Sequence, residues 1–201
     1  MIIGLTGSIG AGKSTVSAKL RELGALVLDA DVFARDAVES GSPGLARIAR
    51  EFGPGILNRD GSLDRAAMAA EVFAVEGKRQ KLNAIVHPIV LTRLRAETET
   101  CAEAEPQRPV VWDVPLLIES GWAELVNAVW LVSAGKEARV KRIVARDGCT
   151  PSQALSRIAA QMPDEEKRRY AHVIFDNNGD IPALLAQVER QYLALVGRAA
   201  P

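Results

Sequence analysis

The clearest chemical pattern in this chain is the run Gly7-Ser8-Ile9-Gly10-Ala11-Gly12-Lys13-Ser14, which fits the spacing G-x-x-x-x-G-K-S/T throughout. It follows a strand-like apolar run and precedes a helical pattern. In that setting the glycines let successive backbone N–H groups turn towards an anion, and the helix N-terminus adds partial positive charge. Lys13 can reach the β- and γ-phosphates of a nucleotide, and Ser14 can ligate Mg²⁺. The pattern predicts a site for ATP and magnesium.

A phosphate-binding loop occurs in kinases, in switch GTPases and in ATP-driven machines, so other signals must separate these classes. A guanine-reading N-K-x-D is absent, because the nearest run, Asp176-Asn177-Asn178-Gly179, lacks the lysine. The third apolar run ends in Asp113-Val114-Pro115-Leu116 rather than D-x-x-G. Both observations favour a kinase over a GTPase.

Arginines gather in the segment that begins at Lys136. Arg139, Arg142 and Arg146 are spaced i, i+3 and i+7, which places three guanidiniums on one face of a helix, and Arg157 follows in the next helix. A solvated basic face is the usual explanation of such a run. Beside a phosphate loop, cations that neutralise the transferred phosphoryl group are favoured instead. We predict phosphate contacts for Arg146 first and Arg142 second, with Lys13 as a further catalytic cation.

Carboxylates follow two of the apolar runs, at the strand ends where open α/β sheets bind ligands. Asp31 is either a helix N-cap or the group that accepts or orients the hydroxyl of a phosphoryl acceptor. Asp29 competes for that role, and the residues alone do not decide between them. Asp113 is either a partner of Mg²⁺ or a carboxylate that merely ends its strand.

Five apolar runs predict the strands that position these groups. The runs are continuous rather than alternating, which indicates strands covered on both faces of a parallel sheet. Helical patterns lie between them, so we predict an α/β fold with a five-stranded parallel sheet of the P-loop NTPase type, flanked by helices. The predicted strands are Ile2–Thr6, Leu26–Asp29, Val110–Asp113, Ala128–Val132 and Val173–Asp176.

Two long segments interrupt this alternation within what we predict is a single domain, 1–201. The core then comprises about 1–31, 108–135 and 168–201. A helical lobe spans about 32–107, with helices around Leu45–Phe52, Asp64–Val75 and Lys78–Ala104. An arginine-bearing lid spans about 136–167 as a pair of helices. Thr150, Pro151 and Gln153 predict a capping box at the start of the second lid helix.

Composition limits the remaining possibilities. Lys plus Arg and Asp plus Glu both number 25, so the formal net charge is zero and no general attraction to nucleic acid or anionic lipid is expected. No stretch approaches the length of a membrane span, and the two cysteines fit neither a metal site nor a disulfide framework. We expect a cytoplasmic protein that binds neither nucleic acid nor membrane. The sequence does not give the oligomeric state, and a monomer is compatible with it.

The motifs, taken in order, resemble those of the dephospho-coenzyme A kinases over the whole chain. Beyond the phosphate loop, which continues to Thr15, the specific matches are Asp29-Ala30-Asp31 with Arg35, and Val86-His87-Pro88. Val114-Pro115-Leu116-Leu117 with Glu119 follows, and later matches include Arg142, Arg146-Asp147-Gly148, Arg157 with Gln161, and Asp176-Asn177-Asn178-Gly179.

The resemblance implies an enzyme that uses ATP to phosphorylate the ribose 3′-hydroxyl of dephospho-CoA, the final step of coenzyme A synthesis. It favours Asp31 over Asp29 at that hydroxyl. Residues implied at the acceptor are Asp31, Arg35, His87, Leu116 and Glu119. Residues implied at the nucleotide are Gly10, Ala11, Gly12, Lys13, Ser14 and Thr15, with Arg146 on the phosphates and Asn177 near the adenine.

Two alternatives stay open from the sequence. The chain could be a P-loop kinase of another small acceptor, such as a nucleoside monophosphate or a sugar. The long helical lobe favours a larger acceptor than these. The chain could also be a regulatory ATPase without a small-molecule acceptor, although the missing switch motifs and the neutral charge count against that.

Overall fold

The computed structural model describes residues 1–74 and 76–199, and its framework is one parallel sheet in the order β2-β3-β1-β4-β5. Each predicted strand is present within one residue of its expected bounds. In the register, Ile3 of β1 lies opposite Val111 of β3 and Ala128 of β4. The strands are β1 (Ile2–Gly7), β2 (Leu26–Asp29), β3 (Val110–Asp113), β4 (Ala128–Ser133) and β5 (Val173–Asp176).

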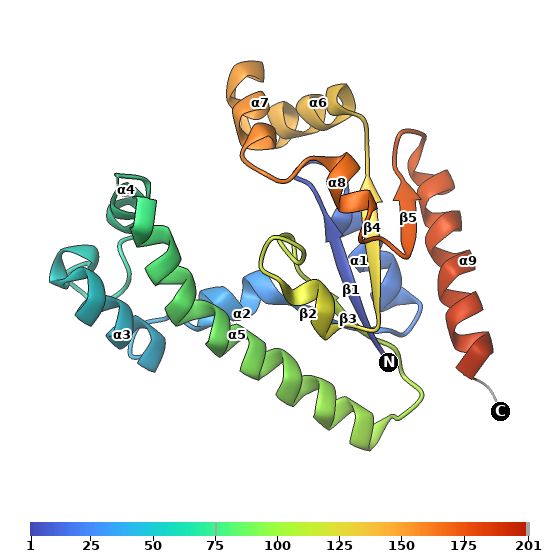
Figure 1. Ribbon diagram of the computed structural model, residues 1–201, viewed down its shortest axis with the longest axis horizontal. Coiled ribbons are helices and arrows are strands. Elements are labelled where there is room, and N and C mark those ends of the chain that lie inside the picture. Colours follow the sequence, from blue (N-terminus) through green and yellow to red (C-terminus); the bar gives the residue numbers. More distant parts are fainter. Residues whose placement is uncertain (75, 200–201) are drawn as a thin grey trace. The chain divides into compact units, whose positions relative to one another are not determined.

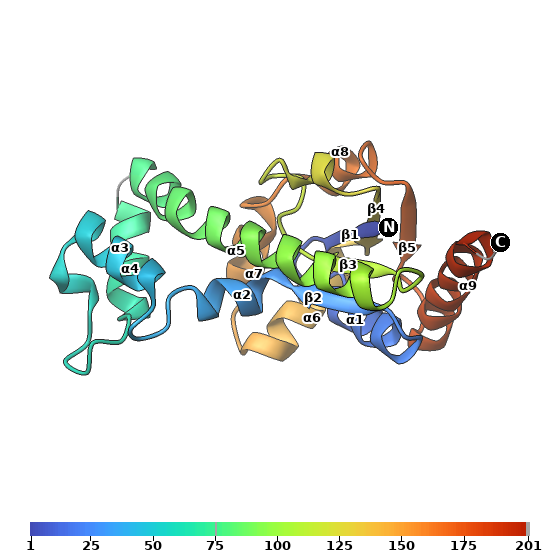
Figure 2. The same ribbon diagram turned by 90° about the horizontal axis from the view of Figure 1, so that it is seen from below.

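The chain divides into two compact units, residues 1–28 with 100–201 and residues 29–99. In the first unit, helices α1 (Lys13–Glu22) and α9 (Ile181–Ala199) lie side by side against the sheet (Figures 1 and 2). They cover a largely aliphatic core to which the sheet and both helices contribute, together with an edge-to-face pair of Trp130 and Phe175 at a centroid distance of 5.4 Å. The chain therefore forms a buried core although only 4% of its residues are aromatic.

Three helices connect β4 to β5 in the same unit: α6 (Lys136–Asp147), α7 (Pro151–Ala159) and α8 (Asp164–Arg168). The capping box predicted for the second of them is confirmed, because Thr150 accepts from the Gln153 N–H and the Gln153 side chain accepts from the Thr150 N–H. Only two helices were predicted between these strands. The third, α8, has five residues and was missed.

The second unit is helical. It contains α2 (Ala30–Asp36), α3 (Pro43–Phe52), the 3-10 turn η1 (Pro54–Ile56), α4 (Arg65–Ala74) and most of α5 (Glu76–Ala104). Ile48, Ile56 and Met68 meet at its core. The helices predicted there are confirmed, although Val75, the last residue expected for one of them, lies outside the described residues. α5 continues through Pro88.

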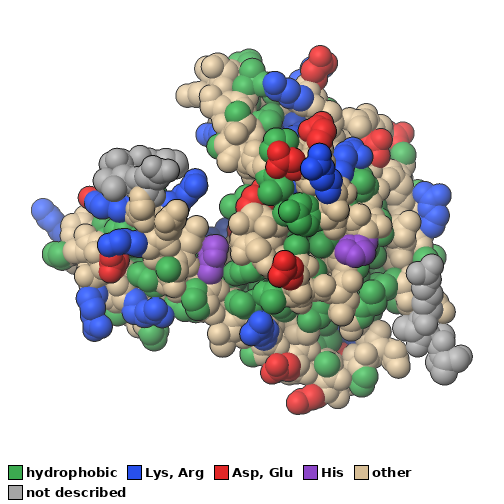
Figure 3. Space-filling view, viewed as in Figure 1, with side chains coloured by type: hydrophobic (Ala, Val, Ile, Leu, Met, Phe, Trp, Pro, Cys, Tyr) green, Lys and Arg blue, Asp and Glu red, His purple; other side chains and the backbone are tan. Residues whose placement is uncertain are grey.

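The surface agrees with the neutral composition. On the face of the sheet-containing unit seen in Figure 3, blue basic and red acidic side chains are interspersed rather than separated. Within the described chain, no helix combines the length and the apolar character that crossing a membrane requires.

Candidate active site

The loop between β1 and α1 has the backbone of a phosphate cradle. Gly10 and Gly12 have φ of 78° and 95°, in the left-handed region that glycine adopts without strain. A Cβ on Gly12 would also collide with the side-chain amide of Asn177. α1 begins at Lys13, and no side chain caps its first turn. Its N-terminal N–H groups and the helix dipole therefore form an anion-binding end.

Lys13, which begins α1, lies next to Asp113, which ends the neighbouring strand β3. The Lys13 ammonium pairs with Oδ1 of Asp113, and the Ser17 hydroxyl donates to Oδ2 at 2.5 Å. Asp113 is buried, with 3% of its surface exposed. The carboxylate at the end of β3 therefore contacts Lys13 of the phosphate loop, and its role towards Mg²⁺ stays a prediction.

The same place offers oxygen ligands of the kind that Mg²⁺ takes. Ser14 is exposed in the first turn of α1, and Asp113 pairs with the adjacent residue, Lys13. Among the described residues, no group of three or more His, Cys, Asp or Glu side chains could hold a metal ion.

Arg139 fits neither explanation offered for the arginine run, because it is neither solvated nor open to a nucleotide phosphate. It is buried, with 6% exposed, and Nε donates to the Ile9 carbonyl at 3.0 Å while Nη1 pairs with Asp164 at 3.1 Å. The Ile9 N–H donates to Oε1 of Gln161 at 2.8 Å. The backbone N–H and C=O of Ile9 in the phosphate loop are therefore both bound by side chains from the segment that connects β4 to β5.

Arg142 lies against the other half of the loop. It donates to the Gly10 carbonyl at 3.3 Å and to the Asn177 carbonyl at 2.9 Å. The buried amide of Asn177 in turn donates to the Ala11 carbonyl at 2.7 Å. Arg142 and Asn177 therefore both donate to backbone carbonyls of the phosphate loop, while the phosphate contact of Arg142 and the adenine contact of Asn177 stay predictions.

Arg146 stands apart from these two. Its side chain is 62% exposed and makes a bidentate contact with Asp147, through Nε at 2.7 Å and Nη2 at 3.0 Å. Arg157 also pairs with Asp147, at 2.6 Å. Hydrogen bonding to Arg146 lowers the pKa of Asp147 and raises that of the guanidinium, so both groups stay charged at neutral pH. Arg146 is an exposed cation at the end of α6.

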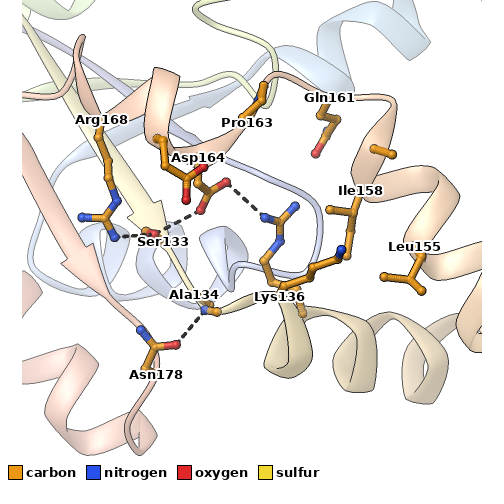
Figure 4. Close-up of a pocket in the computed structure, with 14 residues that line it drawn as sticks. Ser133, Ala134, Lys136, Leu155, Ile158, Gln161, Pro163, Asp164, Arg168 and Asn178 are labelled. Carbon is orange, nitrogen blue, oxygen red and sulfur yellow. Dashed lines mark hydrogen bonds and ion pairs between the residues drawn. The ribbon is translucent and has the colours of Figure 1, made fainter.

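α8 supplies contacts that were not predicted from the sequence. Asp164 accepts from the hydroxyls of Ser8 at 2.5 Å and Ser133 at 3.1 Å, in addition to Arg139. Figure 4 shows this carboxylate in the wall of a pocket of about 400 Å³, with Arg168 donating to Ser133 nearby. The signal that could have located α8 is the run Asp164-Glu165-Glu166-Lys167-Arg168, with acids in the first turn and bases in the last.

In the helical unit, Asp29 rather than Asp31 is the N-cap of α2. The Asp29 carboxylate accepts from the N–H groups of Asp31 at 2.9 Å and Val32 at 3.2 Å. Asp31 is exposed in the first turn, and Arg35 is exposed in the last turn. The capping alternative considered for Asp31 is therefore wrong. His87, in α5, is half-buried, and burial lowers its pKa, which favours the neutral imidazole.

The segment after β3 carries the two remaining candidates. Leu116 is 46% exposed, whereas Leu117 beside it is fully buried. The Glu119 carboxylate lies 2.7 Å from the ammonium of Lys167 in α8. The structure therefore anchors this segment through Leu117 and presents Leu116 at the surface.

Comparison with known proteins agrees with this geometry. Residues 1–183 match the family model of dephospho-CoA kinase. A dephospho-CoA kinase of Symbiobacterium thermophilum is 49% identical over 196 residues, 98% of this chain and 82% of that protein. One of Anaeromyxobacter dehalogenans is 45% identical over 196 residues, 98% and 92% of the two chains. A crystal structure from Thermus thermophilus has a TM-score of 0.83 at 39% identity, covering 100% of this chain and 98% of that one.

Proposed function

Because the chain belongs to the dephospho-CoA kinase family, we propose that it transfers the γ-phosphoryl group of ATP to the ribose 3′-hydroxyl of dephospho-CoA, giving CoA and ADP. The observation that carries this proposal is the phosphate loop itself. Lys13, the uncapped first turn of α1 and Asp113 converge there, in a chain whose family match covers 183 of its 201 residues.

The nucleotide side is assigned to the loop and the segment behind it. Backbone N–H groups from Gly10 to Thr15 would bind the phosphates, with the Lys13 ammonium balancing their charge. Arg146 is the exposed cation that could approach the transferred group, and Arg142 supports the loop. Asn177, whose side-chain amide donates to the Ala11 carbonyl, is assigned to the adenine because of the family resemblance. Ser14 and Asp113 would hold magnesium, which would offset the negative charge of the phosphates.

The acceptor side is assigned to the helical unit and the segment after β3. Asp31 would accept or orient the 3′-hydroxyl proton as the oxygen attacks phosphorus. Arg35, His87, Leu116 and Glu119 would bind other parts of the acceptor. A neutral His87 would do so as a hydrogen-bonding group rather than as a cation. We retain the lobe at about 32–107 and the lid at about 136–167 as parts of this proposal.

The test separates Asp31 from Asp29. Since Asp29 makes the capping hydrogen bonds of α2, Asp31→Asn should leave stability unchanged and lower kcat by about 10²–10⁴, with ATP binding retained. The loose transition state of phosphoryl transfer favours the lower end of that range. Steady-state kinetics with dephospho-CoA and calorimetric binding of ATP measure the two quantities.

Asp29→Asn is the matched control. Asparagine caps a helix about as well as aspartate, so this variant should keep more activity than Asp31→Asn. An inactive Asp29→Asn beside an active Asp31→Asn would overturn the catalytic assignment but not the kinase. ADP release with adenosine monophosphates, or with no acceptor, at the rate seen with dephospho-CoA would overturn the proposed substrate.

A further inference from the structure

Lys167 has an unusual position for a lysine. Its side chain is 0% exposed in α8, and its Nζ lies 2.7 Å from Oε1 of Glu119. Within the described residues the ammonium has no aligned hydrogen bond. The Glu119 carboxylate is therefore its close ionic contact, and that carboxylate is 21% exposed. One member of the pair is sealed in the protein, and the other reaches solvent.

Fold stability does not explain a lysine at this place. Removing an ammonium from water costs several kcal/mol, and buried ion pairs can often be replaced by apolar residues of similar size without loss of stability. α8 already has other attachments, through Asp164 to Ser8 and through Arg168 to Ser133. A methionine at 167 could fill the same space at lower desolvation cost.

The placement of Glu119 indicates what the pair accomplishes. Glu119 follows a stretch whose backbone is fixed, because the Val114 N–H donates to Leu5 of β1 and Leu117 is fully buried. A glutamate side chain on that fixed backbone still has free torsions. An opposite charge held rigidly behind one carboxylate oxygen restricts those torsions and leaves the carboxylate at the surface as a hydrogen-bond acceptor.

We propose that Lys167 is a positioning residue for the phosphoryl acceptor, which acts by holding the Glu119 carboxylate in the orientation that receives a hydroxyl group of the acceptor. This inference rests on the proposed function, in which Glu119 lies by dephospho-CoA. Lys167 itself touches no substrate. Its contribution falls on the affinity for the acceptor and not on the affinity for ATP.

The test is Lys167→Met in the full-length enzyme. The KM for dephospho-CoA should rise about tenfold or more, and the KM for ATP should stay within about twofold, both measured at a temperature where the variant is folded. An unchanged KM for dephospho-CoA in the folded variant would overturn the proposal. If the methionine variant does not fold, Lys167→Gln, which keeps a polar donor without the charge, is judged by the same criteria.

A double-mutant cycle with Glu119→Gln separates positioning from a merely structural contact. If Lys167 acts through Glu119, Lys167→Met should have little further effect on the KM for dephospho-CoA once Glu119 is Gln. The full effect persisting in that background would contradict the proposal. Lys81→Met, which removes an exposed lysine paired with Glu51 at 2.6 Å, is the matched control and should leave both KM values unchanged.

The wild-type reaction distinguishes this inference from the proposed function. A wild-type enzyme that does not phosphorylate dephospho-CoA would overturn the function itself. An active wild type with an unaffected Lys167→Met variant would overturn only the role of Lys167.

Discussion

The two ends of α6 place the same kind of side chain in opposite settings. Arg139, near the start, is 6% exposed and bound to Ile9 and Asp164. Arg146, near the end, has a side chain 62% exposed and bound to its neighbour Asp147. A guanidinium enclosed by protein acceptors stabilises the phosphate loop, whereas an exposed one can exchange its surface partner for a phosphate. The burial of each arginine side chain of α6 therefore separates a structural cation from a candidate catalytic one.

The largest effect is expected at the buried end. Arg139→Met leaves the Asp164 carboxylate and the Ile9 carbonyl without their cationic partner, so the free energy of unfolding should fall by about 3–5 kcal/mol. Urea unfolding measures this loss. Adding Asp164→Asn should restore part of it, since the uncompensated charge is then removed. A loss below about 1 kcal/mol would show that the two ends of α6 do not differ in this way.

At the exposed end the effect should fall on catalysis instead. Arg146→Ala should lower kcat by about 10²-fold, because its charge would act on the transition state, while Tm stays nearly constant. Steady-state kinetics and thermal unfolding of the same preparation measure both. A normal kcat would return Arg146 to the ordinary role of a solvated surface cation.

Arg142 should show an intermediate, mixed effect. Arg142→Ala removes charged donors from the Gly10 and Asn177 carbonyls, so we expect a loss of about 2 kcal/mol in unfolding free energy together with a higher KM for ATP. Urea unfolding and ATP titration check the two parts. If only kcat changed, Arg142 would have a catalytic role like that proposed for Arg146 and no structural role like that of Arg139.

The smallest effect concerns Asp147 and pH. Its pKa is lowered chiefly by the hydrogen bond with Arg146, so the stabilising contact is fully present above the unfolded pKa of about 4 and is lost as pH falls through the folded value. Arg146→Ala should move the Asp147 pKa back up towards its ordinary value. NMR titration of the carboxyl carbon measures the shift. Because Asp147 is solvent-exposed, little change in global stability is expected.

Local patterns in the sequence were sufficient for much of the fold. The five strands, the phosphate loop and the capping box at Thr150 were predicted because each depends on residues adjacent in the chain. Continuous apolar runs indicate buried parallel strands, and glycines at 10 and 12 indicate a backbone with positive φ. The predicted family is likewise confirmed by the match over residues 1–183.

Tertiary packing decided the rest, because burial depends on partners far away in the chain. Ser8 and Asp164 are 156 residues apart, and Arg139, which contacts both Asp164 and the distant Ile9 carbonyl, is buried rather than part of a solvated face. Helix spacing predicts that Arg139 and Arg146 share a face, but it does not predict how deeply each side chain is buried. The sequence by itself determined the phosphate chemistry, since consecutive residues form that loop. The packing of α6 and α8 against the loop decided which arginine is exposed and so able to contact a phosphate.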